Sequence, residues 1–205
     1  MSKRLILVTG GARAGKSGFA LKLVQRLSLP AEPGTTPVLF VATAEAGDAE
    51  MEERIREHRS SRPPEWHTVE EPIHLSEAVS RALSEPGTRD AGVVVVDCLN
   101  LWVSNMLLAG RDREQAAIEE GVMDSARRLL ECYRQGKGSF VLVSNEVGLG
   151  LVPSHPLGRH FRDLLGKVNQ LVAASADEVY LLVAGLPLEL KALSGQVVDP
   201  DADDC

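Results

Sequence analysis

Five apolar runs, each bounded by turn residues, divide the chain. Within these runs, apolar residues follow one another without alternating with polar residues. Strands that are buried on both faces of a sheet have this pattern. The runs therefore predict strands inside a sheet rather than surface segments. They are Leu5–Val8, Val38–Ala42, Val93–Val96, Phe140–Val143 and Val179–Val183.

Segments with a helical spacing of apolar residues separate these runs. They predict helices at Lys16–Leu27, Ala49–Ser60, Leu75–Leu83, Arg113–Gln135 and Leu157–Ala174. Strands and helices that alternate in this way are typical of an α/β fold, with a mainly parallel sheet and right-handed crossovers. The length of 205 residues fits one such domain, which we place at residues 1–197. Residues 198–205 include four aspartates and predict a flexible acidic tail.

Composition and charge exclude several classes of protein and of binding partner. Hydrophobic residues make up 44% of the chain and charged residues 25%, which argues against disorder. The net charge of -7 predicts no broad binding to nucleic acid or to anionic membranes. Three scattered cysteines form no disulfide framework, and no apolar run approaches the roughly 20 residues that cross a bilayer. The first run is also too short for a signal-peptide core, so we expect a cytoplasmic protein.

The first predicted strand leads into a glycine-rich motif. Its residues match the pattern GxxxxGK[ST] and are Gly10, Gly11, Ala12, Arg13, Ala14, Gly15, Lys16 and Ser17. The glycines let backbone N–H groups converge on phosphate oxygens, and the following helix adds its positive dipole end. Lys16 would reach the β- and γ-phosphates, and Ser17 would bind Mg²⁺. The sequence therefore predicts a P-loop nucleotide-binding enzyme.

A P-loop enzyme also needs an acid that holds the magnesium ion. Asp97 follows four valines at the end of a predicted buried strand, where such an acid is found. The same aspartate could instead cap a helix that begins near Cys98, because aspartate is a favoured N-cap residue. Capping and magnesium binding are not exclusive, so Asp97 and Ser17 are the predicted metal ligands.

A histidine lies on the docking face of the second predicted helix. Met51, Ile55, His58 and Arg62 follow one another at spacings of four, three and four, which places them on one face. Arg59 and Arg62 flank the histidine with guanidinium groups suited to phosphate recognition. On these residues alone, the plainer interpretation is a solvated histidine on a charged helix.

Two polar segments further along the chain indicate position or pairing rather than a function. Ser144, Asn145 and Glu146 follow a buried strand, where α/β enzymes place loops that face ligands, but the residues themselves indicate no role. Further along, Arg159 and Asp163 are four residues apart, and we expect them to form an ion pair on one helix face.

Taken in order, these motifs resemble the bifunctional adenosylcobinamide kinase and adenosylcobinamide-phosphate guanylyltransferase family of cobalamin biosynthesis. The similarity runs from about Leu5 to about Gly185, and the ordered set is far more specific than a P-loop alone. The matching segments are Leu7–Ser17, Ala42–Ala44, Arg54–Arg59, Arg62–Pro63, Ser144–Gly148, Arg159–Asp163 and Val168–Gln170.

The resemblance implies a RecA-like P-loop NTPase fold, a homotrimer and two reactions, with GTP and ATP as substrates. A nucleoside triphosphate phosphorylates a hydroxyl of adenosylcobinamide, and GTP then donates GMP to that phosphate, which gives adenosylcobinamide-GDP and pyrophosphate. The family's guanylylated histidine matches His58, so the resemblance reverses the plainer interpretation of that residue. Beyond the P-loop, it implies nucleotide contacts for Ala42, Thr43, Ala44, Arg59, Ser60, Ser61, Arg62, Glu70 and Asp97.

The chain departs from the family pattern at a few positions, and two other functions stay open. Glu57 stands where some relatives have a second histidine, Asp97 replaces a glutamate seen in others, and Ser28–Pro37 looks inserted. One alternative is a single-function P-loop kinase for another small alcohol, in which His58 is only a surface residue. The other is a RecA-like ATP-driven regulatory module. Neither alternative would produce adenosylcobinamide-GDP.

Overall fold

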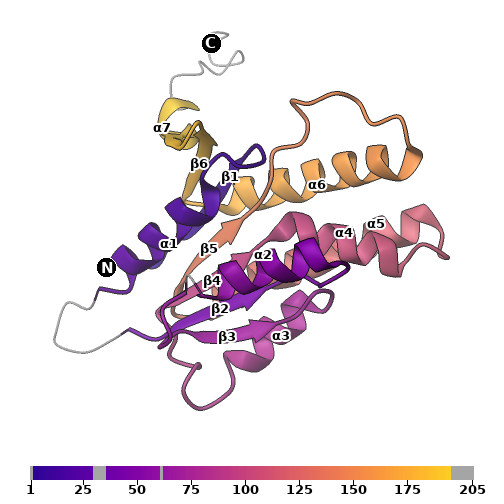
Figure 1. Cartoon of the computed structure of the whole chain (residues 1–205). Coiled ribbons are helices and arrows are strands. Elements are labelled where there is room, and N and C mark those ends of the chain that lie inside the picture. The colour runs from indigo at the N-terminus through magenta and orange to yellow at the C-terminus, as the bar shows by residue number, and fades with distance from the viewer. Residues whose placement is uncertain (1, 30–35, 61, 195–205) are drawn as a thin grey trace, which may run out of the picture.

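The computed structural model describes residues 2–29, 36–60 and 62–194 (Figure 1). The predicted acidic tail at 198–205 and Ser61 lie outside the described residues, as does most of the segment that looks inserted. Within the described parts, no helix is both long and apolar enough to cross a membrane.

One sheet of seven strands runs through the molecule in the order β3-β2-β4-β5-β1-β6-β7. All neighbouring strands are parallel except β6 and β7, which are antiparallel. This arrangement confirms the predicted α/β fold with a mainly parallel sheet. The strands are β1 (Leu5–Gly10), β2 (Val38–Ala42), β3 (His67–Glu70), β4 (Val93–Asp97), β5 (Ser139–Val143), β6 (Glu178–Val183) and β7 (Leu186–Glu189).

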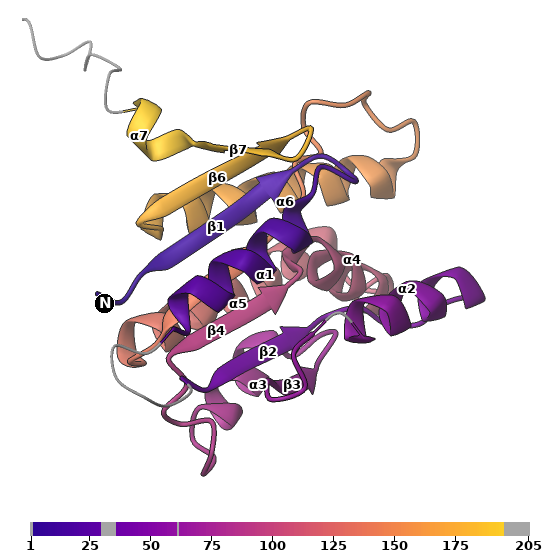
Figure 2. The ribbon, with the colours of Figure 1, turned by 60° about the vertical axis from the view of Figure 1, so that its left-hand side comes forward.

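Helices cover both faces of this sheet (Figure 2). They are α1 (Lys16–Leu27), α2 (Ala49–Ser60), α3 (Leu75–Ala82), α4 (Leu99–Ala109), α5 (Gln115–Gln135), α6 (Pro156–Ser175) and α7 (Leu190–Ser194). Alternate residues of β1 point to opposite faces, because successive side chains in a strand alternate. Ile6 and Val8 pack with Val24 of α1, whereas Leu5 and Leu7 belong to the core formed with α3, α4, α5 and α6.

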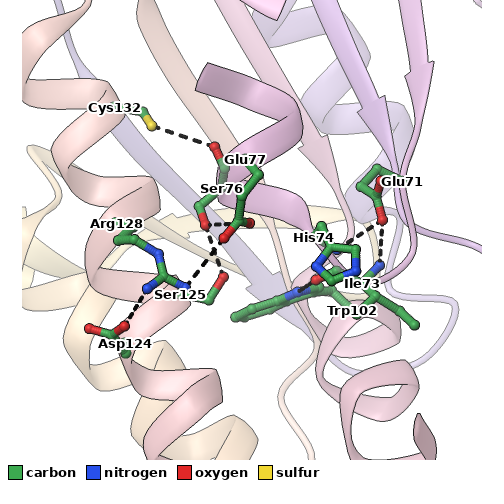
Figure 3. A network of polar contacts seen from close by, with 10 residues as sticks. All are labelled: Glu71, Ile73, His74, Ser76, Glu77, Trp102, Asp124, Ser125, Arg128 and Cys132. Carbon is green, nitrogen blue, oxygen red and sulfur yellow. Dashed lines mark hydrogen bonds and ion pairs between the residues drawn. The ribbon is translucent and has the colours of Figure 1, made fainter. Parts of the chain in front are cut away.

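Polar contacts join α3 to α5 within the larger core (Figure 3). The hydroxyl groups of Ser76 and Ser125 are 3.1 Å apart and buried. Arg128 forms ion pairs with Asp124 of its own helix and, at 3.4 Å, with Glu77 of α3. These contacts join two helices on the face of the sheet opposite α1.

The apolar runs and helical patterns predicted five strands and five helices at positions close to those observed. Four elements were not predicted, namely β3, α4, the exposed edge strand β7 and the five-residue helix α7. The physical reason is clearest for the first two. Strand β3 is an edge strand with mostly exposed residues, so it has no apolar run. Helix α4 is apolar on nearly all sides, and its Leu99, Trp102, Val103 and Leu107 are buried, so it shows no amphipathic period.

The strand order brings four loops to one edge of the sheet. Ala42 at the end of β2 pairs with Asp97 at the end of β4, and Asp97 pairs with Val143 at the end of β5. Val143 in turn pairs with Val8 of β1, shortly before the glycine-rich motif. In open parallel sheets, ligands bind at this carboxyl edge.

Candidate active site

The glycine-rich motif forms a tight loop between β1 and α1. Gly10 has a φ of 148°, and a Cβ atom there would lie 2.5 Å from the Leu182 carbonyl oxygen of the neighbouring strand. Gly15 has a φ of 94° and occupies the N-cap position of α1. The loop therefore requires glycine at both ends, and it leaves the N-terminus of α1 open toward the carboxyl edge, as phosphate binding demands.

Lys16 lies at the start of α1 with only 9% of its surface exposed. Its Nζ donates a hydrogen bond to the Gly11 carbonyl at 2.7 Å, so the side chain folds back over the loop. Burial lowers the pKa of Lys16, and Cys98 and Asp97 only partly offset that effect. An anionic ligand at the loop would compensate the buried ammonium group.

A cavity of about 470 Å³ lies at the carboxyl edge. It brings together ten of the residues singled out in the sequence, although these come from five separate segments. They are Ala12, Arg13, Lys16, Ser17, Ala42, Ala44, His58, Arg62, Glu70 and Asp97. Met51, Ile55 and Asn145, also discussed above, line it as well. The rest of the wall was missed by sequence reasoning and is formed by Cys98, Asn100, Leu101 and Val143.

Asp97 lies at the end of β4 with 15% of its side chain exposed, and its Oδ2 is 3.9 Å from Nδ1 of His58. Burial raises the pKa of Asp97, against the opposing influence of His58, Arg62 and Lys16. The hypothesis that Asp97 caps the next helix is wrong, because Cys98 holds the N-cap position of α4. The carboxylate instead faces the cavity, which Lys16, His58 and Arg62 also line.

Helix α2 presents the face predicted from its spacing. Met51, Ile55 and His58, together with Arg62 just beyond the helix, all line the cavity. The helix leaves the sheet beyond the end of β2 and reaches over the carboxyl edge (Figure 2). The His58 side chain is 52% exposed, so it lies at the mouth of the cavity rather than in the core.

Arg62 separates this cavity from a second one of similar volume, about 470 Å³. Its guanidinium group lies 4.0 Å from the centre of the Phe40 ring. Burial lowers the pKa of Arg62, whereas Asp97 and Glu70 favour its charged form. Glu70 borders both cavities and forms an ion pair with Arg59. The second cavity is lined by Arg59, Arg62, Pro63, Pro64, Trp66, Thr68 and Glu70.

Gly10, Gly11, Ala14 and Gly15 of the P-loop line neither cavity, and beyond the P-loop two described residues with implied nucleotide contacts also lie elsewhere. Thr43 is fully buried beneath the cavity, where its hydroxyl group bonds to the backbone of Cys98. Ser60 lines neither cavity, and its hydroxyl donates to the Glu57 carbonyl at 2.8 Å.

The expected ion pair between Arg159 and Asp163 is wrong. Arg159 folds back from the first turn of α6 and donates to the carbonyl groups of Pro153 and Ser154, at 3.0 and 2.6 Å. Asp163 pairs with its neighbour Arg162 at 3.1 Å. The prediction from spacing took no account of the preceding loop, whose two carbonyl groups accept the hydrogen bonds of Arg159, and an exposed ion pair on a helix contributes little by comparison.

A metal site made by the protein alone is not found among the described residues, because no three His, Cys, Asp or Glu side chains cluster in a suitable way. Magnesium needs no such cluster, since it binds one or two protein oxygens and completes its shell with water and substrate phosphates. Ser17 and Asp97 offer two oxygen donors on one cavity. The donor set therefore fits a magnesium ion held jointly with a nucleotide.

A strand–glycine loop–helix unit, a buried acid at the end of β4, two strands away from β1, and a cavity between them define a P-loop nucleotide-binding α/β protein. The family described as cobinamide kinase / cobinamide phosphate guanyltransferase matches residues 6–190. The chain belongs to this family.

Three curated relatives are similar over most of their length. The bifunctional adenosylcobalamin biosynthesis protein CobP of Pseudomonas aeruginosa is 43% identical over 186 residues, which cover 90% of this chain and 96% of CobP. The protein of the same description named CobU is 40% identical in Salmonella typhimurium and 38% identical in Escherichia coli. Each of these two alignments covers 91% of this chain and 99% of the relative.

Proposed function

We propose that this chain phosphorylates adenosylcobinamide and then transfers GMP from GTP to the resulting phosphate, through a guanylylated His58. The observation that carries the proposal is that His58 and the P-loop Lys16 line one cavity, in a chain that belongs to the cobinamide kinase / guanyltransferase family. One bound triphosphate can then meet both a phosphate-binding loop and a nucleophile.

In the first reaction, the substrate alcohol oxygen bonds to the γ-phosphorus while the bond from this phosphorus to the β–γ bridging oxygen breaks. The nucleoside diphosphate leaves with the electron pair, and the alcohol proton passes to solvent. Lys16 and the N–H groups of the loop stabilise the charge that moves onto the β-phosphate. The low exposure of Lys16 strengthens this interaction, because water screens it little.

In the second reaction, an imidazole nitrogen of His58 bonds to the α-phosphorus of GTP, and pyrophosphate leaves. A phosphate oxygen of adenosylcobinamide phosphate then bonds to the same phosphorus, and the phosphorus–nitrogen bond breaks, which restores His58. The open mouth where His58 lies suits this step, since a large corrinoid must approach the histidine from solvent. Arg62, also on the cavity, would compensate the phosphate charges.

Ser17 and Asp97 would hold Mg²⁺ in this site, and the ion would neutralise phosphate charge while the nucleotide is bound. Residues 1–197 would act as a single catalytic domain, assembled as a homotrimer in the cytoplasm. We extend the nucleotide contacts to Gly10–Ser17, Ala42, Ala44, Arg59, Arg62 and Glu70, and leave out Thr43 and Ser60, which line neither cavity.

Incubation of the chain with adenosylcobinamide, ATP, GTP and magnesium tests the proposal. Adenosylcobinamide-GDP should form, and chromatography with mass detection would identify it. Lys16→Ala should disable both reactions, because both donors place their phosphates on the same loop. A chain that stops at adenosylcobinamide phosphate would be a single-function kinase, and one that makes neither product would have another function.

A further inference from the structure

Two segments that the resemblance leaves without a role meet beside the cavity. Ser144 and Asn145 follow β5, and Asn169 lies in α6. The fully buried hydroxyl of Ser144 donates to Oδ1 of Asn169 at 2.6 Å. The Nδ2 of Asn169 donates to the carbonyl oxygen of Asn145 at 3.0 Å. One amide side chain thus holds two consecutive residues of the loop from behind.

The same loop is also bonded to the strand that carries the P-loop. The N–H of Ser144 donates to the Val8 carbonyl at 2.9 Å, and the N–H of Glu146 donates to the Gly10 carbonyl at 3.0 Å. The backbone on either side of Asn145 is therefore fixed to the end of β1, where the phosphate-binding loop begins. A functional side chain on such a support keeps a defined direction.

Strand β5 lies between β1 and β4, so Asn145 emerges between the P-loop and Asp97. Asn145 lines the cavity together with Lys16, Ser17 and Asp97. No residue that the structure describes forms a hydrogen bond with the side-chain amide of Asn145. An amide with two N–H donors thus faces the place where nucleotide phosphates would lie.

We propose that Asn145 is a catalytic residue that donates a hydrogen bond to the terminal phosphoryl group of the bound triphosphate, and that Asn169 is its positioning residue. This inference rests on the proposed function and assigns the terminal phosphate to one side chain. The amide gives up no proton in the phosphoryl transfer described above. It stabilises the charge on the oxygens of the transferred group while the alcohol oxygen bonds and the diphosphate leaves.

Nucleotide binding tests this contact without any corrinoid. Affinities are measured by calorimetry for GDP and for a GTP analogue whose γ-phosphate cannot be transferred. Asn145→Ala should weaken the analogue about fivefold, as expected for one lost hydrogen bond, and leave GDP within about twofold. Asn145→Asp, which has the same size but lacks the donor and adds charge, should weaken the analogue more. Equal changes for both nucleotides, or no change, would overturn the proposal.

Turnover separates the catalytic role from the positioning role. Asn145→Ala should lower kcat of the kinase step by about 100-fold with a much smaller change in KM, because the donor acts mainly as charge develops. Asn169→Asp keeps the acceptor for Ser144 but loses the donor to Asn145, and it should reduce the preference for the analogue over GDP. Gln170→Ala, an exposed neighbour on α6, is the matched control and should change neither quantity.

The result for Asn169 is read together with its melting temperature. A lower melting temperature with an unchanged preference for the analogue would show that Asn169 is only structural. If the native chain prefers the analogue but makes no adenosylcobinamide phosphate, the proposed function fails while the phosphate contact stands. These outcomes therefore distinguish the two proposals.

Discussion

The hydroxyl group of Thr43 donates to the carbonyl of Cys98 at 2.7 Å and accepts from the N–H of the same residue at 2.8 Å. This pair of bonds joins the loop after β2 to the residue that follows Asp97. A third bond, from Nδ2 of Asn105 to the Thr43 carbonyl at 2.8 Å, ties the joint to α4. Thr43 therefore supports the cavity from below.

Thr43→Val should keep the shape of this joint and remove both hydrogen bonds. Two buried backbone groups of Cys98 would lose their partner, which costs about 2 kcal/mol. In a chain of this size, that corresponds to a melting temperature lower by about 4–8 °C. Turnover measured well below the melting temperature should also fall, because Asp97 loses its support, whereas Thr43→Ser should retain both properties.

GDP binding without magnesium should not change in Thr43→Val, since the side chain is fully buried. Calorimetry checks this point. Weaker GDP binding with an intact fold would show that Thr43 contacts the nucleotide directly, as the resemblance implies.

His58→Ala should abolish GMP transfer and leave measurable kinase activity. Only the guanylyl step needs a covalent nucleophile, and His58 is half exposed, so its removal disturbs little packing. With GTP labelled at the α-phosphate, the native chain should acquire an acid-labile, base-stable label. Label that persists on a folded His58→Ala chain would identify another nucleophile.

Asp97→Asn should lower magnesium-dependent turnover by about 100-fold or more, because a neutral amide is a poor ligand for the ion. It should not lower the melting temperature at neutral pH. Burial raises the pKa of Asp97 in the folded chain, so the ionised carboxylate costs stability above that pKa. Any gain in the melting temperature of the variant should shrink as pH falls and the native carboxylate becomes protonated. Thermal melts across pH check the sign.

Glu77→Gln tests the contacts between α3 and α5. Burial alone would raise the pKa of Glu77, but hydrogen bonds from the backbone and Ser76, with the charges of Arg128 and His74, lower it overall. The ionised group therefore stabilises the fold above its unfolded pKa, and this contribution disappears as pH falls through the lowered folded pKa. The variant should melt about 1–2 °C below the native chain at neutral pH, since exposed ion pairs contribute little. The difference should vanish at low pH, and Ser80→Ala, exposed on the same helix, should show no such dependence.

The sequence predicted the parts of the fold that follow from local patterns. Apolar runs indicated the buried strands, and the spacing from Met51 to Arg62 indicated the face of α2 that lines the cavity. The P-loop was evident because its conformation requires particular residues at fixed positions. Asp97 was found because it ends a buried strand.

The remaining wall of the cavity depends on which strands are neighbours, and no local pattern records strand order. Leu101 and Asn145 line the same cavity as the P-loop because β5 lies between β1 and β4, which brings the segments after β4 and β5 beside that loop. Their side chains have no unusual spacing of their own. The spacing of Arg159 and Asp163 gave a wrong prediction for a related reason. It took no account of the loop before α6, whose carbonyl groups bind Arg159.

Lys16 and His58 line one cavity, and this fixes the order of product release and GTP binding in the proposed enzyme. A chain that has just phosphorylated a corrinoid still holds a nucleoside diphosphate on its loop, and GTP cannot enter for guanylylation until that product dissociates. Nucleoside diphosphates should therefore inhibit the second reaction in competition with GTP. The energy state of the cell, expressed as its ratio of triphosphate to diphosphate, would then govern how quickly the corrinoid is activated.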